Sequence, residues 1–346
     1  MRIERFGPAA DESRLRACYQ IVVDAQPQDD PNVPPPSYRG FRGWWVHGQA
    51  GTPQQTWLAR SDAGTPVGCY VLELPELENR NLAFGYATVA LAARRRGVGT
   101  ALVAHAAEQA ELAGRTLLIS RARVGGPGHA FAAAIGARPD MQDARRVLDV
   151  GPAMDARLPA LRAEAASHAA GYTLRRWTGP APDELADQVC SLFTAMEDAP
   201  HEDSVEPERW DTARLRAAEA RGIAEGNRWY QIGAMHDVSG EMAALTQVNI
   251  DPAIDGWAFQ EITAVTRSHR GHRLGLHVKV AMLEWLAQEE PQVRTIVTFN
   301  AVQNQHMIAV NDALGHRVTD CFESFELEVA AARKLVAPAG VRRVPR

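Results

Sequence analysis

A chain of 346 residues is long for one compact domain and comfortable for two, each of which can bury its own core. With 46% hydrophobic and 23% charged residues, the composition is that of an ordinary globular protein. A formal net charge of −5 argues against a nucleic-acid partner that binds mainly through its phosphates. The sequence holds no run of about 18 apolar residues and no apolar signal-peptide core, so we expect no membrane span and a cytoplasmic location. The four cysteines are widely spaced, which is typical of free thiols rather than of a disulfide framework or a zinc site.

The first half of the chain predicts a domain of residues 1–150 built around antiparallel strands. A strand at 2–6 precedes a helix at 11–23 with an acidic first turn, and a long loop rich in Pro and Asp follows. Apolar stretches separated by turns then predict strands at 56–60, 67–74 and 82–89 and, after a loop rich in Arg and Gly, a helix at 101–110, a strand at 116–119, a short helix at 129–135 and a closing strand at 146–150.

The second half repeats this plan. Residues 151–170 carry Leu and Ala at helical spacing and are expected to form a helical linker. A second domain at 171–330 follows, and a tail of 331–346 ends in an Arg- and Pro-rich part that we expect to be poorly ordered. Within the second domain the pattern predicts a strand at 173–177, helices at 183–196 and 208–224, strands at 229–234, 241–250 and 257–265, a helix after a second Arg-rich loop, a strand at 295–299, a helix at 304–314 and a strand at 322–329.

The loop between the strand at 82–89 and the helix after it suits a phosphate group. The first backbone N–H groups of a helix lack internal partners and carry the positive end of the helix dipole. Glycines let a diphosphate lie against the backbone of such a loop, and arginines supply neutralising charge. The residues concerned are Arg94, Arg95, Arg96, Gly97, Val98, Gly99 and Thr100, whose pattern Arg-x-x-Gly-x-Gly differs from the glycine patterns of dinucleotide-binding folds and P-loop NTPases.

A second copy of this arrangement lies 176 positions further along the chain. The strand at 257–265 is followed by an Arg/Gly loop and a helix with an apolar face. That loop comprises Arg270, Gly271, His272, Arg273, Leu274 and Gly275, and Gly275 takes the place of Gly99, since 275 − 99 = 176. Two similar units of this length indicate two domains rather than a solenoid, whose repeats span roughly 20–50 residues.

Both loops resemble the coenzyme A pyrophosphate loop of the GNAT acetyltransferase superfamily, which has the pattern Arg/Gln-x-x-Gly-x-Gly/Ala at the same strand-to-helix junction. The resemblance covers residues 1–330, and the chain is similar to actinobacterial tandem members, with a layout like that of mycothiol synthase. It implies an α/β (α+β) fold of two tandem GNAT domains, each with a mixed, mostly antiparallel central sheet flanked by helices. It also implies acetyl-CoA, or another acyl-CoA, as cosubstrate and no metal.

The resemblance further implies where the coenzyme makes its contacts. In the superfamily the strand before the loop separates from its neighbour and its backbone binds the pantetheine arm, and an Asn after the next strand often contacts that arm. Carried over to this chain, the coenzyme contacts are the two loops together with Val89, Leu91, Val265, Leu276, Asn300 and Asn304. The alternative for the asparagines is helix capping and turn formation, which suits Asn304 better than Asn300.

The two copies differ at the residues that carry chemistry. Glu261 stands where many members carry a glutamate that takes a proton from the acceptor amine, and its match in the first copy is Gly85. The first loop, however, fits the family pattern fully, whereas Arg273 replaces the first glycine of the second, where its side chain either crowds the diphosphate or binds it. The tyrosine that protonates the leaving thiolate in many members is replaced by Asn311 in the second copy and by Ala132 in the first. We therefore take Glu261 and Asn311 as the candidate catalytic residues.

An acidic stretch of the second domain lies where this fold places its acceptor loops. Its candidate substrate contacts are Glu197, Asp198 and Glu202. As a wall of the acceptor site they favour a cationic amine, and the alternative is a solvated loop. Three histidines, His269, His272 and His277, surround the second Arg/Gly loop, but without cysteine or carboxylate partners they do not predict a metal site.

These observations predict an acyl-CoA-dependent N-acyltransferase that moves an acetyl group to a primary amine of a small molecule by direct attack. Glu261 and the acidic stretch favour the second domain as the catalytic one. One alternative exchanges the roles of the halves, with a water chain in place of the carboxylate. Another is a non-catalytic coenzyme A-binding pseudo-acetyltransferase with a sensing or partner-binding role, favoured by the missing tyrosines. Fold alone specifies neither the acceptor nor the oligomeric state.

Overall fold

The computed structural model describes residues 1–49, 52–196, 200 and 202–335, and the chain divides into two compact units. The first unit comprises Met1–Gln142, Glu202–Glu206 and the chain from Phe322 onward, and the second comprises Asp143–His201 and Pro207–Cys321. Each unit therefore includes residues from the other half of the sequence. The units differ in this respect from a sequential division into 1–150 and 171–330.

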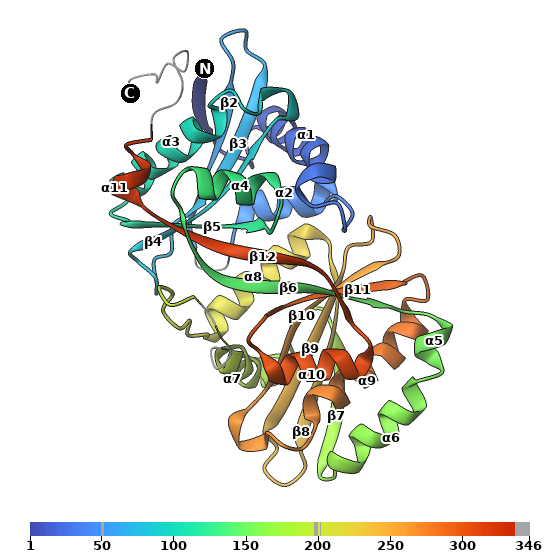
Figure 1. Ribbon diagram of the computed structural model, residues 1–346. Coiled ribbons are helices and arrows are strands. Elements are labelled where there is room, and N and C mark those ends of the chain that lie inside the picture. Colours follow the sequence, from blue (N-terminus) through green and yellow to red (C-terminus); the bar gives the residue numbers. More distant parts are fainter. Residues whose placement is uncertain (50–51, 197–199, 201, 336–346) are drawn as a thin grey trace. The chain divides into compact units, whose positions relative to one another are not determined.

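The sheet of the first unit contains five strands from the N-terminal half and one from the C-terminal half (Figure 1). In spatial order they are β1 (Arg2–Phe6), β2 (Gln54–Arg60), β3 (Pro66–Glu73), β4 (Leu82–Val89), β5 (Leu117–Arg123) and the part of β12 (Arg317–Glu328) that begins at Phe322. Neighbouring strands are antiparallel except for β4 and β5, which are parallel.

Helices cover both faces of this sheet. They are α1 (Glu12–Asp29), α2 (Tyr38–His47), the short η1 (Leu91–Ala93), α3 (Val98–Leu112), α4 (Pro127–Ala134) and α11 (Val329–Ala332). Alternate side chains of a strand point to opposite faces, and β3 shows this directly. Cys69 and Val71 join the apolar cluster under α1 and α2, whereas Tyr70 and Leu72 join the cluster under α3.

The second unit repeats the same architecture. Its strands, in spatial order, are β7 (Tyr172–Thr178), β8 (Arg228–His236), β9 (Met242–Ile250), β10 (Trp257–Val265), β11 (Thr295–Ala301) and the end of β6 (Arg138–Asp149). Only β10 and β11 are parallel among these neighbours. Its helices are α5 (Pro152–Asp155), α6 (Leu158–His168), η2 (Asp183–Leu185), α7 (Ala186–Ala195), α8 (Thr212–Glu225), η4 (Arg267–His269), α9 (Leu274–Glu289) and α10 (Gln305–Leu314). Side chains of α6 and α9 share one apolar cluster, and side chains of α7 and α8 share another.

The strand that closes each sheet comes from the other half of the chain. In the first unit, residues from Phe322 to Glu328 of β12 pair with β5, from Phe322 opposite Arg123 to Glu328 opposite Leu117. In the second unit, the end of β6 pairs with β11, from Ala301 opposite Asp143 to Thr295 opposite Asp149. Figure 1 shows β6 in green and β12 in red. Sequence patterns identify both strands, but they do not identify the sheet that each one joins.

Helix α2 lies in a segment that the sequence indicates as loop. Ser37 caps it, since its side-chain oxygen accepts a hydrogen bond from Gly40 N at 3.0 Å. Phe41 and Trp45 are four residues apart, so they share one face of the helix, and both are buried with their rings stacked. The spacing of these aromatic residues indicates a helix, whereas the run of prolines just before them indicates a loop.

The expected fold class is confirmed, because each unit has a mixed, mostly antiparallel sheet flanked by helices. Within the described ranges, no helix is both long enough and apolar enough to cross a membrane.

Candidate active site

Both units contain a pair of parallel strands that separate part-way along. In the first unit β4 pairs with β5 only from Leu82 to Phe84, and in the second β10 pairs with β11 only from Trp257 to Phe259. A hydroxyl side chain bridges each pair at the next residue. Ser120 Oγ donates to Gly85 O at 2.8 Å, and Thr298 Oγ1 donates to Gln260 O at 3.3 Å. Beyond these bridges each strand continues to pair only with its antiparallel neighbour.

Strand β10 carries a bulge at the point where it leaves β11. Its register with β9 shifts between Gln260 and Thr263, so that Glu261 and Ile262 lie opposite the single residue Gln247. A bulge of this kind redirects side chains and leaves backbone groups out of the ladder. In the first unit, β4 pairs with β3 residue by residue from Phe84 to Val89.

The bulge corrects the alignment of the two copies. The two hydroxyl bridges make Gly85 equivalent to Gln260, not to Glu261. The offset between the copies is 257 − 82 = 175 before the bulge and 265 − 89 = 176 after it. Glu261 is thus an inserted residue that has no counterpart in the first unit. The shared Ala-Phe at 83–84 and 258–259 is the sequence signal that would have revealed the insertion.

The Gln260 side chain stabilises the bulge from within. Its Nε2 donates to Gln247 O at 2.6 Å and to Thr246 Oγ1 at 3.0 Å. Thr246 Oγ1 also lies 2.8 Å from Thr263 Oγ1. A backbone carbonyl that the irregular register would leave without a partner is therefore satisfied, which fixes the conformation around Glu261.

The Glu261 carboxylate stands in surroundings that favour proton uptake. It accepts a hydrogen bond from Asn249 Nδ2 at 3.1 Å. Although water reaches the side chain, the protein atoms that crowd it raise the pKa of Glu261, and the positive charge of Arg221 together with the Asn249 bond opposes this rise. Burial also raises the pKa of Glu225 on α8, and the nearby Glu261 charge adds to that effect. A carboxylate whose pKa moves toward neutrality is a better base for an amine.

The loop of the first unit presents the start of α3 to solvent. Gly97 is the residue before the helix and has a left-handed backbone with φ of +80°, which glycine adopts without strain. Arg95 and Arg96 are exposed beside it. Arg94 is held back, because it donates to Val89 O at 3.2 Å and pairs with Asp29 at 2.7 Å. Two arginines and the first amides of α3 are therefore available to an anion.

The second loop has a similar backbone, but an arginine takes the place of the glycine that precedes the helix. Arg273 precedes α9 with φ of +50°, so it adopts the left-handed conformation that Gly97 adopts in the first unit. Its guanidinium pairs with Glu164 on α6. The Arg273 side chain therefore points toward α6, and the residue resembles Gly97 only in its backbone conformation. Arg270 and His272 are exposed in the same loop, and φ of Gly271 is +90°.

The three histidines around the second loop have different surroundings. His269 Nδ1 lies 2.8 Å from the Tyr172 hydroxyl, and His269 Nε2 lies 3.3 Å from Glu241 Oε2. The ring of His272 packs against Tyr172 with centroids 5.4 Å apart. Burial lowers the pKa of His277. Over the part of the chain that the structure describes, no group of three or more such side chains is arranged to hold a metal ion.

The asparagines in and after β11 have separate roles. Asn304 caps α10, since its Oδ1 accepts from Met307 N at 3.1 Å. Asn311 is fully buried; it accepts a hydrogen bond from Lys279 Nζ at 2.7 Å and donates one to Asn300 Oδ1 at 3.1 Å. Sequence reasoning missed Lys279, although a lysine within the apolar surface of a helix is the signal that would have identified it.

Of the three acidic residues expected at the acceptor site, the structure describes only Glu202. Glu197 and Asp198 are outside the described residues. Glu202 belongs to the first unit, where it accepts a hydrogen bond from Ser324 Oγ at 2.6 Å. It stands near Tyr86 of β4, whose pKa is raised by burial and by the charges of Glu73 and Glu202. Tyr86 keeps 39% of its surface exposed.

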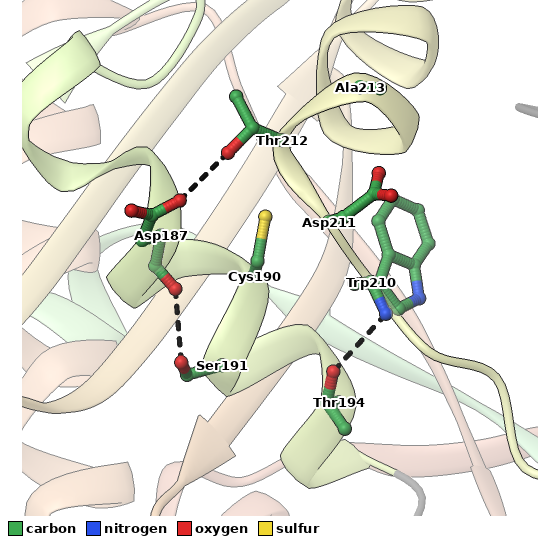
Figure 2. Close-up of a pocket in the computed structure, with 8 residues that line it drawn as sticks. All are labelled: Asp187, Cys190, Ser191, Thr194, Trp210, Asp211, Thr212 and Ala213. Atoms are coloured by element: carbon green, nitrogen blue, oxygen red, sulfur yellow. Dashed lines mark hydrogen bonds between the residues drawn. The ribbon is translucent and has the colours of Figure 1, made fainter.

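A surface hollow of about 690 Å³ lies between α7 and the start of α8 (Figure 2). Thr212 donates to Asp187 Oδ1 at 2.8 Å across it, and Trp210 N donates to Thr194 Oγ1 at 3.3 Å. Figure 2 shows the Cys190 side chain between these two bridges, and burial raises the pKa of its thiol. The residues that line the hollow include none of the predicted site residues. The hollow is thus distinct from the separating strands of the second unit, beside which Glu261 and the second Arg-rich loop lie.

Comparison with known proteins identifies the family. Residues 15–123 match the model of the acetyltransferase (GNAT) family. The solved structure of a tandem GNAT protein from the clavulanic acid biosynthesis pathway, without acetyl-CoA, is 30% identical to this chain, with 94% of this chain and 98% of that one covered at a TM-score of 0.76. The chain belongs to the GNAT family. It is a tandem GNAT protein and thus an N-acetyltransferase, whose family uses acetyl-CoA as the general donor.

More distant structures share the fold of this tandem GNAT protein. A GCN5-related N-acetyltransferase from Sphaerobacter thermophilus is 16% identical, with 94% of this chain and 95% of that one covered at a TM-score of 0.61. A glucosamine N-acetyltransferase region of a fungal multi-domain β-N-acetylglucosaminidase is 13% identical, with 94% and 38% covered at a TM-score of 0.60. No curated protein matches the chain by sequence.

Proposed function

We propose that the second unit catalyses direct transfer of an acetyl group from acetyl-CoA to the primary amine of a small molecule. The observation that carries this proposal is the bulge in β10, which inserts Glu261 where the parallel strands separate. The first unit has the same loop and the same separation of strands, but it lacks the inserted carboxylate. A difference of one residue therefore coincides with the group that the chemistry needs.

The donor occupies the loop and the opening beside it. Its diphosphate lies at the N-terminus of α9, where the first amides have no partner within the helix and where Arg270 and His272 are exposed. Gly275, in the first turn of α9, leaves room at this point, since an added Cβ would approach Val265 only to 3.8 Å and Val310 only to 3.9 Å. The pantetheine arm extends between β10 and β11, which places the thioester close to the bulge.

Glu261 takes the proton that the amine must lose. The amine nitrogen attacks the thioester carbon, the C–N bond forms and the C–S bond breaks, with its electron pair moving to sulfur. The departing N–H proton goes to the Glu261 carboxylate, directly or through one water. A positioned base of this kind accelerates such a step by about 10²–10⁴-fold. The Glu261 carboxylate is regenerated in each turnover, because it returns the proton when coenzyme A leaves as the thiol.

One observation favours the opposite assignment, in which the first unit is the catalytic one. In the first unit, Tyr86 is partly exposed on the separating strand and stands near the carboxylates of Glu73 and Glu202. This arrangement suits a cationic acceptor there, with proton transfer to one of these carboxylates. It is the observation that favours the first unit as the working half.

A binding experiment decides which unit holds the donor. Acetyl-CoA is titrated calorimetrically into the coenzyme-free protein, into an Arg95→Glu/Arg96→Glu variant and into an Arg270→Glu variant. Charge reversal repels the diphosphate at one loop and leaves the other intact. The turnover of each variant is measured in the amine assay described next. The proposal expects Arg270→Glu to lose both a binding site and turnover; loss of turnover in the Arg95→Glu/Arg96→Glu variant alone would assign the chemistry to the first unit.

A kinetic experiment tests Glu261 itself. A panel of small primary amines is incubated with acetyl-CoA, and free coenzyme A is followed with a thiol reagent. We expect Glu261→Gln to lower the turnover rate at least 100-fold while acetyl-CoA binding persists. Glu184→Gln makes the same chemical change on the exposed η2 segment and serves as the control. Full activity of Glu261→Gln would exclude this carboxylate as the base, and binding without turnover of any amine would favour the non-catalytic alternative.

A further inference from the structure

A chain of three buried polar side chains lies in the core of the second unit. Lys279 on α9 is 2% exposed, Asn311 on α10 is 0% exposed and Asn300 on β11 is 8% exposed. Lys279 Nζ donates to Asn311 Oδ1, and Asn311 Nδ2 donates to Asn300 Oδ1. Asn300 Nδ2 in turn donates to Ala301 O at 3.1 Å. Every bond in the chain points the same way, from the ammonium group toward β11.

This polar chain ends at the opening between the parallel strands. Asn300 stands two residues after Thr298, so the two side chains share one face of β11. Pairing of β11 with β10 stops at Val297, and from there β11 pairs only with β6. Lys279 lies four residues after Gly275 on the same face of α9, which is the face that contacts Val310 of α10. The chain therefore approaches the opening from the side of α9 and α10, whereas Glu261 is coupled to Arg221 and Glu225 of α8.

The first unit has no equivalent of this chain. Lys279 follows Gly275 by four residues, as Val103 follows Gly99. Asn300 follows Thr298 by two, as Ala122 follows Ser120. Asn311 precedes Gly315 by four, as Ala132 precedes Gly136. The three apolar positions of one unit are thus, in order, Val103, Ala122 and Ala132, and all three are polar in the unit that carries the bulge.

The charged groups around Lys279 do not neutralise it. The Nδ1 atom of His316 lies 3.1 Å from the backbone oxygen of Asn311. Burial lowers the pKa of His316 to about 3, so this side chain is neutral at physiological pH. Arg146 of β6 pairs with Asp312 at the end of α10. Glu284, on the same helix as Lys279, forms an ion pair with Arg162 of α6. Burial lowers the pKa of Lys279 to about 7, so its charge is present or absent within the working range of an enzyme.

We propose that Lys279, acting through Asn311 and Asn300, stabilises the sulfur of the departing coenzyme A in the second unit. This inference rests on the proposed function of that unit. As the C–S bond breaks, the electron pair and the negative charge move to sulfur in the opening between β10 and β11. Asn300 Nδ2 has a second hydrogen besides the one that binds Ala301 O, and the ammonium group polarises the amide chain so that this hydrogen becomes a stronger donor.

No proton leaves Lys279 in this step. The amine proton goes to Glu261, and it reaches sulfur through water when coenzyme A is released, so the lysine keeps its charge throughout. Lys279 is therefore a positioning residue that works through two amides. It supplies the electrostatic assistance that the tyrosine of other family members would supply as an acid, at the point where this chain has Asn311.

The test measures the acidity of the bound coenzyme A thiol. Coenzyme A is bound to the protein in the Arg95→Glu/Arg96→Glu background, and the ultraviolet absorbance of the thiolate is followed as pH rises, with desulfo-coenzyme A as the blank. Because Lys279 holds its proton only up to a pH of about 7, we expect thiolate to appear around neutral pH in the bound coenzyme, at lower pH than in free coenzyme A, and Lys279→Met to remove this early ionisation. His316→Leu removes a neutral neighbour from the same cluster and should keep the shift. Asn311→Leu breaks the chain but keeps the lysine, so it should also remove the shift. It provides the test if Lys279→Met does not fold.

The outcomes separate this inference from the proposed function. A bound thiol with the same pKa in wild type, Lys279→Met and Asn311→Leu would overturn the role of Lys279, while acetylation of an amine by the second unit would still stand. Failure of the second unit to bind acetyl-CoA at all would overturn the proposed function first. In turnover assays we expect Lys279→Met to reduce kcat about tenfold with little change in acetyl-CoA affinity, because the interaction forms only as sulfur departs.

Discussion

The ionisation of Lys279 makes the stability of the second unit depend on pH in a way that can be measured. In the unfolded chain a lysine keeps its proton up to a pH of about 10.4. Burial lowers the pKa of Lys279 to about 7 in the folded unit, so the folded state releases the proton first. Between these two values the unfolded state binds more protons, and stability therefore rises with pH. Replacing Lys279 with Met removes this dependence.

The expected magnitude follows from the two pKa values. From pH 7.0 to pH 8.5, linkage gives a gain of about 1.5 kcal/mol in the unfolding free energy of the wild-type unit, relative to Lys279→Met. This range avoids other titrations. The shift of His316 acts below its unfolded pKa of about 6.5, and the raised thiol pKa values of Cys18 and Cys190 reduce stability only at higher pH.

Hydrogen exchange of α9 reports this quantity for the second unit alone. Exchange of peptides from Leu274–Glu289 is compared between wild type and Lys279→Met at the same pH, so that intrinsic exchange rates cancel. Peptides from α3 of the first unit, Val98–Leu112, provide the control and should show no difference between the proteins. If the difference in unfolding free energy between wild type and Lys279→Met stays constant from pH 7.0 to pH 8.5, the reasoning is refuted, because Lys279 then does not titrate in this range.

Three further predictions concern packing and hydrogen bonding. Gly222→Ala should destabilise the second unit by about 1–3 kcal/mol in urea denaturation, although alanine favours helices, because the new Cβ would lie 1.7 Å from Trp229 Cζ2. Asp320→Ala should cost about 1–3 kcal/mol in the same assay, since it removes the carboxylate to which the buried guanidinium of Arg145, 1% exposed, donates two hydrogen bonds; unchanged stability would contradict this. Asn304→Ala should cost about 1 kcal/mol by removing the cap of α10, seen as faster exchange confined to the first turn of that helix.

Much of the fold follows from patterns that are local in sequence. Alternating strands, turn residues and the two Arg/Gly loops identify the two units and most of their elements, because each depends on residues within one segment. The exchange of β6 and β12 does not follow, since a strand pattern shows which face is buried but not which neighbour it pairs with. Helix α2 was hidden because its aromatic face follows directly on a run of prolines, at 34–36, that indicates a loop.

The candidate site was predictable in its loops and less so in its side chains. Glu261 could be selected from its distance to the loop, but its insertion depends on a register shift that only the paired strand reveals. The Arg273 side chain departs toward Glu164, a residue more than one hundred positions away in the sequence. Glu202 belongs to the first unit for a similar reason, because Ser324 of the exchanged strand holds it there. Each of these outcomes depends on a long-range contact, which no local pattern encodes.

The differences between the two units argue for a division of labour. A buried lysine and an irregular strand both reduce stability, so packing alone would favour the apolar residues and regular register found in the first unit. In the second unit these costly features occur together, with Glu261 on the side of α8 and the Lys279–Asn311–Asn300 chain on the side of α9 and α10 of the same opening. A base on one side and a positive charge on the other are what attack by an amine and departure of a thiolate require. We therefore propose that the first unit binds the coenzyme without performing this step, because it keeps the glycine loop and lacks these groups.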